Sequence, residues 1–212
     1  HALRIDEQVA GSTDLARLNE FAREQNLLVR QYDSHKCPYL DLSLPWPEFL
    51  ATRGSKMKKN LKALARKLDA EGKVELRHYT GGGGILEGYD LLLQIHEKSW
   101  KREKKVGLSS SPEYQAFYRD WLPPMAARGA ARILILFCGG KAVSGTSAFM
   151  DGTTYYSTHI AHDDAFSRFS PGTLLEALEF EDLMTHRRFA CYDFLGGALN
   201  NKRRWTETLR PT

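Results

Sequence analysis

Residues 153–197 decide the fold, and they read TTYYSTHIAH, DDAFSRFS, PGTLLEALEFEDLMTHRR and FACYDFLGG. The first run is rich in Thr and Tyr, as strands are, and the last run is a second strand that places Asp193 just before a Gly-Gly pair. Between them a polar loop leads to Pro171, which suits the first position of a helix because its missing N–H would be unpaired there anyway. The stretch predicts a strand, a loop, a helix and a second strand.

The start of this predicted helix is a candidate phosphate site. Ser170 is the expected N-cap. Gly172, Thr173 and Leu174 are expected to present free backbone N–H groups at the positive end of the helix dipole. Such groups can hold a phosphate without a metal, so the stretch predicts a pyrophosphate cradle.

Composition indicates a water-soluble chain of one domain, or of one domain and a small annex. The chain has 212 residues, 42% of them hydrophobic and 26% charged, and no apolar run long enough to span a membrane. Its first residues lack the apolar core of a signal peptide. The three cysteines, Cys37, Cys138 and Cys191, show no CxxC spacing, which argues against a disulfide framework and structural zinc. We therefore expect a cytoplasmic protein with no metal.

The net charge of +4 is concentrated in one segment, residues 53–67, which holds seven basic residues and no acid. Ser55 is the expected cap of a helix whose apolar face includes Leu61 and Leu64, with the cations on the other face. That cationic face is either simply solvated or contacts an anionic partner such as a carrier protein, a nucleotide or tRNA.

The middle of the chain predicts a meander of strands. Residues 73–80 form a strand, and Gly81–Gly84 a flexible connection without a phosphate-loop motif. A helix over 86–101 is expected to bury Trp100 and to hold His96 at the edge of the core. A helix from Pro112 is expected to be kinked or interrupted at the Pro123–Pro124 pair. Residues 132–151 predict a hairpin around Gly139–Gly140, with a second turn at Asp151–Gly152. The strand over 153–162 then extends the sheet, and the helix crossover returns the last strand parallel to it.

This order of elements resembles the GNAT acyltransferase fold, an α/β fold with a mixed, mostly antiparallel central sheet flanked by helices. Residues 166–175 (FSRFSPGTLL) resemble the helix start of the Fem-like branch, which includes the acetyltransferases of cellulose and exopolysaccharide gene clusters. Residues 192–197 (YDFLGG) with 202–205 (KRRW) resemble that branch's ending. The resemblance divides the chain into an annex over residues 1–50 and a GNAT-like domain over residues 51–212.

Fem-like proteins are usually longer, with two such halves. The annex carries a predicted helix near residues 12–25 and two extended pieces, 27–32 and 39–44. These pieces are expected either to belong to another half or to complete the sheet. A further helix is expected to begin near Ala198.

The resemblance implies direct transfer of an acyl group from acetyl-CoA, or another acyl-CoA, to an amine acceptor, with no metal. It places the phosphates of CoA at the helix start, on Arg168, Ser170, Gly172, Thr173 and Leu174. A Fem-type aminoacyl transferase that uses charged tRNA at the basic helix is one alternative. A non-catalytic GNAT-like binding module is another.

Three residues are the catalytic candidates. His159 has a suitable pKa range for a base, unless it is an ordinary hydrogen-bonded surface residue; strand alternation puts it on one face with Tyr155 and Ser157. Asp193 is a second candidate base or an anchor for the acceptor ammonium, unless it pairs with Lys202 or Arg203. Tyr192 is the candidate acid, unless its ring simply packs in the core.

Overall fold

A computed structural model describes residues 11–32, 36–102, 104, 107–108, 111–196 and 200–210. The chain forms two compact units, a larger one over residues 41–192 and a smaller one that combines the chain before residue 41 with the chain after residue 192. The chain passes from one unit to the other within strands β1 (Cys37–Asp41) and β6 (Cys191–Asp193).

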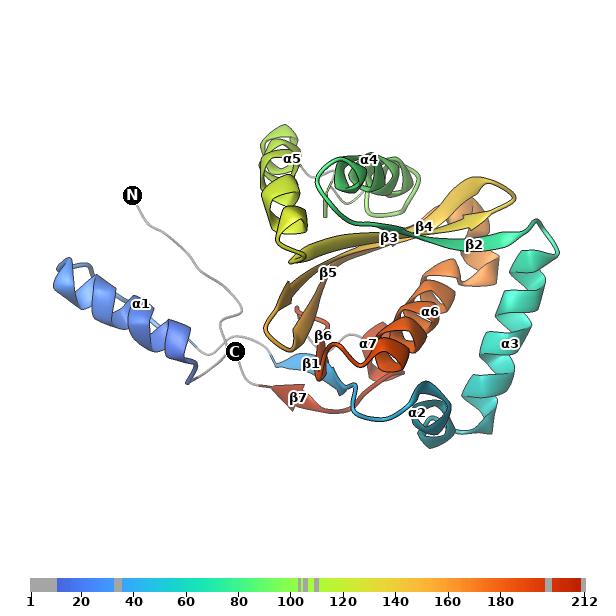
Figure 1. The fold of residues 1–212 in the computed structure, drawn as a ribbon, viewed down its shortest axis with the longest axis horizontal. Coiled ribbons are helices and arrows are strands. Elements are labelled where there is room, and N and C mark those ends of the chain that lie inside the picture. Colours follow the sequence, from blue (N-terminus) through green and yellow to red (C-terminus); the bar gives the residue numbers. More distant parts are fainter. Residues whose placement is uncertain are drawn as a thin grey trace. The chain divides into compact units, whose positions relative to one another are not determined.

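The larger unit contains the meander that the sequence predicts (Figure 1). Strands β2 (Val74–Tyr79), β3 (Ala131–Cys138), β4 (Lys141–Asp151) and β5 (Thr154–His162) pair in this order, each antiparallel to the next. The N–H groups of Ala190 and Cys191, at the start of β6, donate to the Thr153 carbonyl beside the start of β5, at 2.8 and 3.2 Å. Because the start of β6 lies beside the start of β5, the two strands run parallel there. The predicted fold class, a mixed and mostly antiparallel sheet flanked by helices, is confirmed.

Helices cover both faces of this sheet (Figure 1). Helices α4 (Gly84–Glu97) and α5 (Pro112–Ala127) lie on one face, and α3 (Ser55–Asp69) and α6 (Pro171–His186) on the other. Strand β3 shows why: Ile133 and Ile135 belong to one buried cluster, and Leu134 and Leu136 belong to a second one. Successive side chains of a strand point to opposite faces, so a strand covered on both faces must be apolar throughout.

The turns follow the predicted pattern with one shift. Gly139 and Gly140 join β3 to β4 with positive φ values of 55° and 79°, as a two-residue hairpin turn of type I′ requires. The second turn uses Gly152 and Thr153, one residue later than predicted, because Asp151 pairs with Thr154.

Several helix boundaries differ from the prediction. Gly54, with φ 86°, occupies the N-cap of α3 in place of Ser55, which is the first helical residue. Helix α4 ends at Glu97, so Trp100 lies beyond it and is 45% exposed, where the pattern predicted burial. Helix α5 continues through Pro123 and Pro124 to Ala127. A short helix, α2 (Trp46–Thr52), precedes α3, and a 3-10 helix, η1 (Asp164–Phe169), precedes α6.

The smaller unit holds helices α1 (Thr13–Glu24) and α7 (Asn200–Arg203) and strand β7 (Leu209–Arg210). Strand β1 pairs with β7 antiparallel, with Cys37 opposite Arg210. The extended piece predicted over 39–44 is therefore strand at 37–41, while residues 27–32 form neither helix nor strand. Ala198, where a helix was expected to begin, lies outside the described residues, and α7 starts at Asn200.

The three cysteines form no disulfide with one another; Cys37 and Cys138 are buried, and Cys191 is partly buried. Among the described residues, every helix is too short or too polar to traverse a bilayer.

Candidate active site

Strand β5 carries a β-bulge in its middle. Ser147 of β4 pairs with His159 and Ala148 pairs with Ser157, so Thr158 is an extra residue. The Thr158 hydroxyl donates to the Ser147 carbonyl oxygen at 2.9 Å. Because the alternation restarts at the bulge, Tyr155 faces α6 while His159 faces α4 and α5. The prediction that Tyr155 and His159 share a face is therefore wrong.

His159 lies among hydroxyl groups and aromatic rings. Its Nε2 is 3.3 Å from the Tyr114 hydroxyl and its Nδ1 is 3.2 Å from the Ser147 hydroxyl. The Tyr118 ring stands edge-on to it, with centroids 5.2 Å apart. Burial, then the nearby His96, then Lys101, lower the pKa of His159 to about 3. The expected near-neutral pKa is thus not found, and the imidazole is uncharged at physiological pH.

His96 of α4 lies beside His159, with ring centroids 6.3 Å apart. Its side chain has no exposed surface, and neither ring nitrogen has a hydrogen-bond partner among the described residues. Burial, then Lys101, lower the pKa of His96 to about 4. Gly107, with φ 80°, closes over the ring, since a Cβ there would come within 2.8 Å of His96 Cε1. The sequence placed His96 at the core edge, whereas the structure makes it fully buried.

The first turn of α6 is more fully bonded than the sequence predicted. The N–H groups of Thr173 and Leu174 both donate to the Ser170 carbonyl oxygen, at 3.0 and 3.2 Å. Ser170 sits at the N-cap in a left-handed conformation, and its hydroxyl makes no capping bond. With Ser170 at the N-cap, Leu174 is the residue whose N–H makes the first regular helical bond, so its N–H could not be free. Among the described residues, the Gly172 N–H alone of these three finds no acceptor.

Two further polar side chains lie at this helix start. His162, at the end of β5, has its Nε2 3.2 Å from the Ser167 hydroxyl. A Cβ on Gly172 would lie 3.7 Å from His162 Nδ1, in ordinary contact. Arg168 is 70% exposed and pairs with Glu71 at 3.3 Å. The groups available to an anion at this point are therefore the Gly172 N–H, the Ser170 hydroxyl, His162 and Arg168; sequence reasoning missed His162.

Tyr192 belongs to a buried network on the α6 face of the sheet. Its hydroxyl donates to Glu179 Oε2 at 2.9 Å, and the Tyr155 hydroxyl donates to Glu179 Oε1 at 2.5 Å. Arg132 Nε donates to the Tyr155 oxygen at 2.9 Å. Burial, followed by the charge of Glu179, raises the pKa of Tyr192 well above its usual range. The structure therefore separates Tyr192 from His159 by the thickness of the sheet.

Asp193 lies in the smaller unit, where it is almost fully buried. It forms an ion pair with Arg210 and accepts a 2.8 Å hydrogen bond from the Leu195 N–H. Lys202, an expected partner, donates to the Leu195 and Gly196 carbonyl oxygens. The carboxylate thus links the end of β6 to Arg210 of β7 through an ion pair. Gly197 of the Gly-Gly pair lies outside the described residues.

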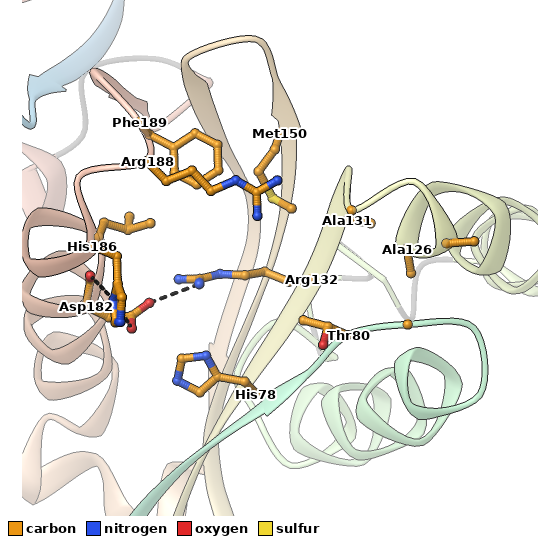
Figure 2. Close-up of a pocket in the computed structure, with 14 residues that line it drawn as sticks. His78, Thr80, Ala126, Ala131, Arg132, Met150, Asp182, His186, Arg188 and Phe189 are labelled. Carbon is orange, nitrogen blue, oxygen red and sulfur yellow. Dashed lines mark hydrogen bonds and ion pairs between the residues drawn. The ribbon is translucent and has the colours of Figure 1, made fainter.

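A cavity of about 570 Å³ lies elsewhere in the larger unit, at the C-terminal end of α6 (Figure 2). It does not contain any of the predicted site residues. No group of three or more His, Cys, Asp or Glu side chains among the described residues could hold a metal ion.

Comparisons with known proteins agree with this architecture. The family model described as "Acetyltransferase (GNAT) domain" matches residues 55–203, and no curated protein matches the chain. Among solved structures, L-PGS from Bacillus licheniformis has a TM-score of 0.60 at 14% identity, over 93% of this chain and 70% of that one. FemX has a TM-score of 0.60 at 12% identity, over 84% of this chain and 60% of its own.

A third similar structure is the C-terminal domain of a proposed lysylphosphatidylglycerol synthetase from Agrobacterium fabrum, with a TM-score of 0.58 at 12% identity. It is matched over 86% of this chain and 59% of its own length, so the chain spans about 60% of this protein and of FemX. These likenesses concern the fold. The family model covers most of the chain, and the chain therefore belongs to the acetyltransferase (GNAT) domain family.

Proposed function

We propose that this chain is an N-acyltransferase that moves an acetyl or related acyl group from a CoA thioester to an amine acceptor. The observation that carries the proposal is the bulge in β5, which turns His159 toward α4 and α5, away from the α6 face. The acceptor would approach from the face of α4 and α5. The sequence resemblance supports the Fem-like branch that includes the cellulose-type acetyltransferases, and a cytoplasmic location suits the CoA donor.

For the donor, we propose that the phosphates bind at the start of α6. The Gly172 N–H, the Ser170 hydroxyl, His162 and Arg168 supply hydrogen-bond donors there, at the positive end of a 16-residue helix. Arg168 would exchange its exposed pairing with Glu71 for a phosphate, at little cost because exposed ion pairs are weak. Thr173 and Leu174 would support this turn by holding the Ser170 carbonyl oxygen.

For the chemistry, we propose that His159 Nε2 receives the proton of the attacking amine. As the C–N bond forms, the nitrogen becomes positively charged and therefore acidic, so an imidazole of low basicity can accept its proton. The C–S bond then breaks, and the CoA sulfur gains one proton in the completed reaction. Ser147, on Nδ1, would hold the ring orientation, and Tyr114, on Nε2, would give way to the acceptor.

Thermal melting with acetyl-CoA, CoA or free 3′,5′-ADP tests the donor. A ligand that binds only the folded chain at about 100 times its Kd stabilises it by about 2.7 kcal/mol, which raises the melting temperature by roughly 5–10 °C. We expect a rise with acetyl-CoA and with CoA, and a smaller one with 3′,5′-ADP. No rise with any of the three would contradict the proposal and leave a non-catalytic binding module as the better account.

A second candidate function is aminoacyl transfer from charged tRNA, favoured by the exposed cationic face of α3. Six of the seven predicted cations are exposed there, namely Lys56, Lys58, Lys59, Lys62, Arg66 and Lys67. The similar folds of FemX and L-PGS are compatible with this candidate but do not distinguish it.

The two functions differ in their response to salt. Binding of aminoacyl-tRNA through several phosphates loses roughly 10³-fold or more in affinity between 50 and 200 mM salt. We expect only weak binding of charged tRNA at 200 mM salt. Saturable binding there, lost in a variant with Lys58, Lys59 and Lys62 changed to Gln, would favour aminoacyl transfer over CoA-dependent transfer.

A further inference from the structure

The cavity at the C-terminal end of α6 is separate from the proposed donor site. Its walls come from the ends of β2, α5, β3, β4 and α6, all within the larger unit (Figure 2). Gly172 and His186 stand at opposite ends of α6, roughly 20 Å apart at the rise of an α-helix. A ligand in this cavity would therefore be a second ligand and not part of the acyl donor.

Nitrogen-rich side chains from two strands and from the segment after α6 point into this cavity. Figure 2 shows Arg132 of β3, His78 of β2 and Arg188, which follows α6, turned toward the same space. Arg132 Nη1 donates to Asp182 at 3.0 Å, but its Nη2 finds no acceptor in the part of the chain that the structure describes. A guanidinium group with one unused donor leaves part of its hydrogen-bonding capacity unmet.

Arg188 is the accessible cation of the cavity. It is exposed, and its guanidinium carbon Cζ lies 5.4 Å from the Phe189 ring centroid. Among the described residues, no carboxylate lies within ion-pair distance of it. Its position on the Phe189 ring keeps the charge beside the cavity without neutralising it.

The carboxylates near the cavity face Arg132 and not Arg188. Asp182, in the lining, pairs with Arg132, and the buried Glu179, outside the lining, also faces Arg132. Cations near the C-terminal end of a helix often serve only to offset the helix dipole. That explanation fits His186 of α6 and Arg188, which follows the C-cap residue, but not Arg132 or His78, which come from strands.

The remaining wall is apolar. It consists of alanines from α5 and β3 together with larger side chains from β4, α6 and the segment after α6, namely Ala126, Ala131, Met150, Leu183 and Phe189. A pocket with an apolar wall and a few convergent polar groups suits a ligand with both characters.

We propose that this cavity binds a small organic carboxylate. Its carboxylate pairs with the exposed Arg188 guanidinium, and the apolar body lies against Met150 and Phe189, with Arg132 in the same lining. The planar guanidinium group matches the geometry of a carboxylate, which favours this class of anion.

The test uses 3-phenylpropionate as the probe and its uncharged amide as the matched ligand, in isothermal titration calorimetry on the whole chain. We expect the acid to bind saturably and the amide at least about ten-fold more weakly, since one charged hydrogen bond is lost. Arg188→Gln should weaken binding of the acid by a similar factor. Arg187→Gln is the control, because Arg187 is an exposed neighbour that does not line the cavity.

Three outcomes would overturn the proposal: no saturable binding of the acid, equal binding of acid and amide, or equal weakening by Arg187→Gln and Arg188→Gln. The binding of acetyl-CoA serves as the independent readout. Because the two sites lie at opposite ends of α6, Arg188→Gln should leave acetyl-CoA binding unchanged, so failure here is distinguishable from failure of the proposed acyl transfer.

Discussion

Two polar clusters lie on opposite faces of β5, and they differ in how completely their hydrogen bonds are made. On the α6 face, both oxygens of the fully buried Glu179 accept hydroxyl groups, from Tyr155 and Tyr192. On the face of α4 and α5, His96 is equally buried, yet both of its ring nitrogens lack partners among the described residues.

The difference indicates different roles. A buried polar group that is fully bonded fixes packing, whereas one left without partners costs folding free energy. Proteins retain such a cost where function needs it. We therefore assign the Glu179 cluster to stability and the His96–His159 cluster to chemistry, and the following predictions test this assignment.

The largest expected effect is on stability, from Glu179→Ala. The substitution leaves the Tyr155 and Tyr192 hydroxyls without their shared acceptor and removes a charge that offsets Arg132. We expect the free energy of unfolding to fall by about 3–5 kcal/mol in urea denaturation. Glu181→Ala, an exposed position of the same helix, should change it by no more than about 0.5 kcal/mol. Similar losses in the two variants would contradict the structural role.

The next effect is on catalysis, from His159→Ala. Loss of the proton acceptor should lower kcat/KM for acetyl transfer by about 10²–10⁴-fold, measured as CoA release with the most active amine of a panel. The melting temperature should change little compared with Glu179→Ala. His186→Ala, an exposed histidine of α6, is the control for activity. Full activity of His159→Ala would contradict the role of His159 as the proton acceptor.

The sequence could predict the framework but not the two clusters. The strand, helix and strand of residues 153–197 were predictable because Pro171 and the apolar patterns act locally. The bulge at Thr158 was not, since it depends on how β5 pairs with β4 and the local sequence has no glycine to signal it. His96 and His159 are far apart in the sequence, so no spacing pattern could reveal that their rings meet.

The start of α6 illustrates a second limit. The helix start and its N-cap, Ser170, were predicted correctly, and that N-cap already implies a bonded Leu174 N–H. The bond from the Thr173 N–H to the same carbonyl oxygen was not predictable. Ser170 accepts from two N–H groups, a detail of backbone geometry that residue types do not encode.

A smaller effect concerns the pH dependence of stability. Folding lowers the pKa of His96 from its usual 6.5 to about 4 by burial, so on acidification the unfolded chain binds a proton first. The free energy of unfolding should therefore fall as the pH drops from about 6.5 toward 4, with His96 accounting for about 2 kcal/mol between pH 7 and pH 5. In His96→Phe this part of the loss should vanish. If the free energy of unfolding of that variant varied with pH as in the wild type, His96 could not be a buried, uncharged histidine.

The most direct measurement of the central claim is calorimetric titration of acetyl-CoA into three forms of the chain: wild type, Gly172→Ala and Gly172→Asp. A Cβ at Gly172 makes only ordinary contacts, 3.7 Å or more from its neighbours, so the alanine variant should bind almost as wild type. The aspartate variant should bind at least about ten-fold more weakly, because its charge repels the phosphates. Equal affinity in all three forms would contradict a donor site at the start of α6.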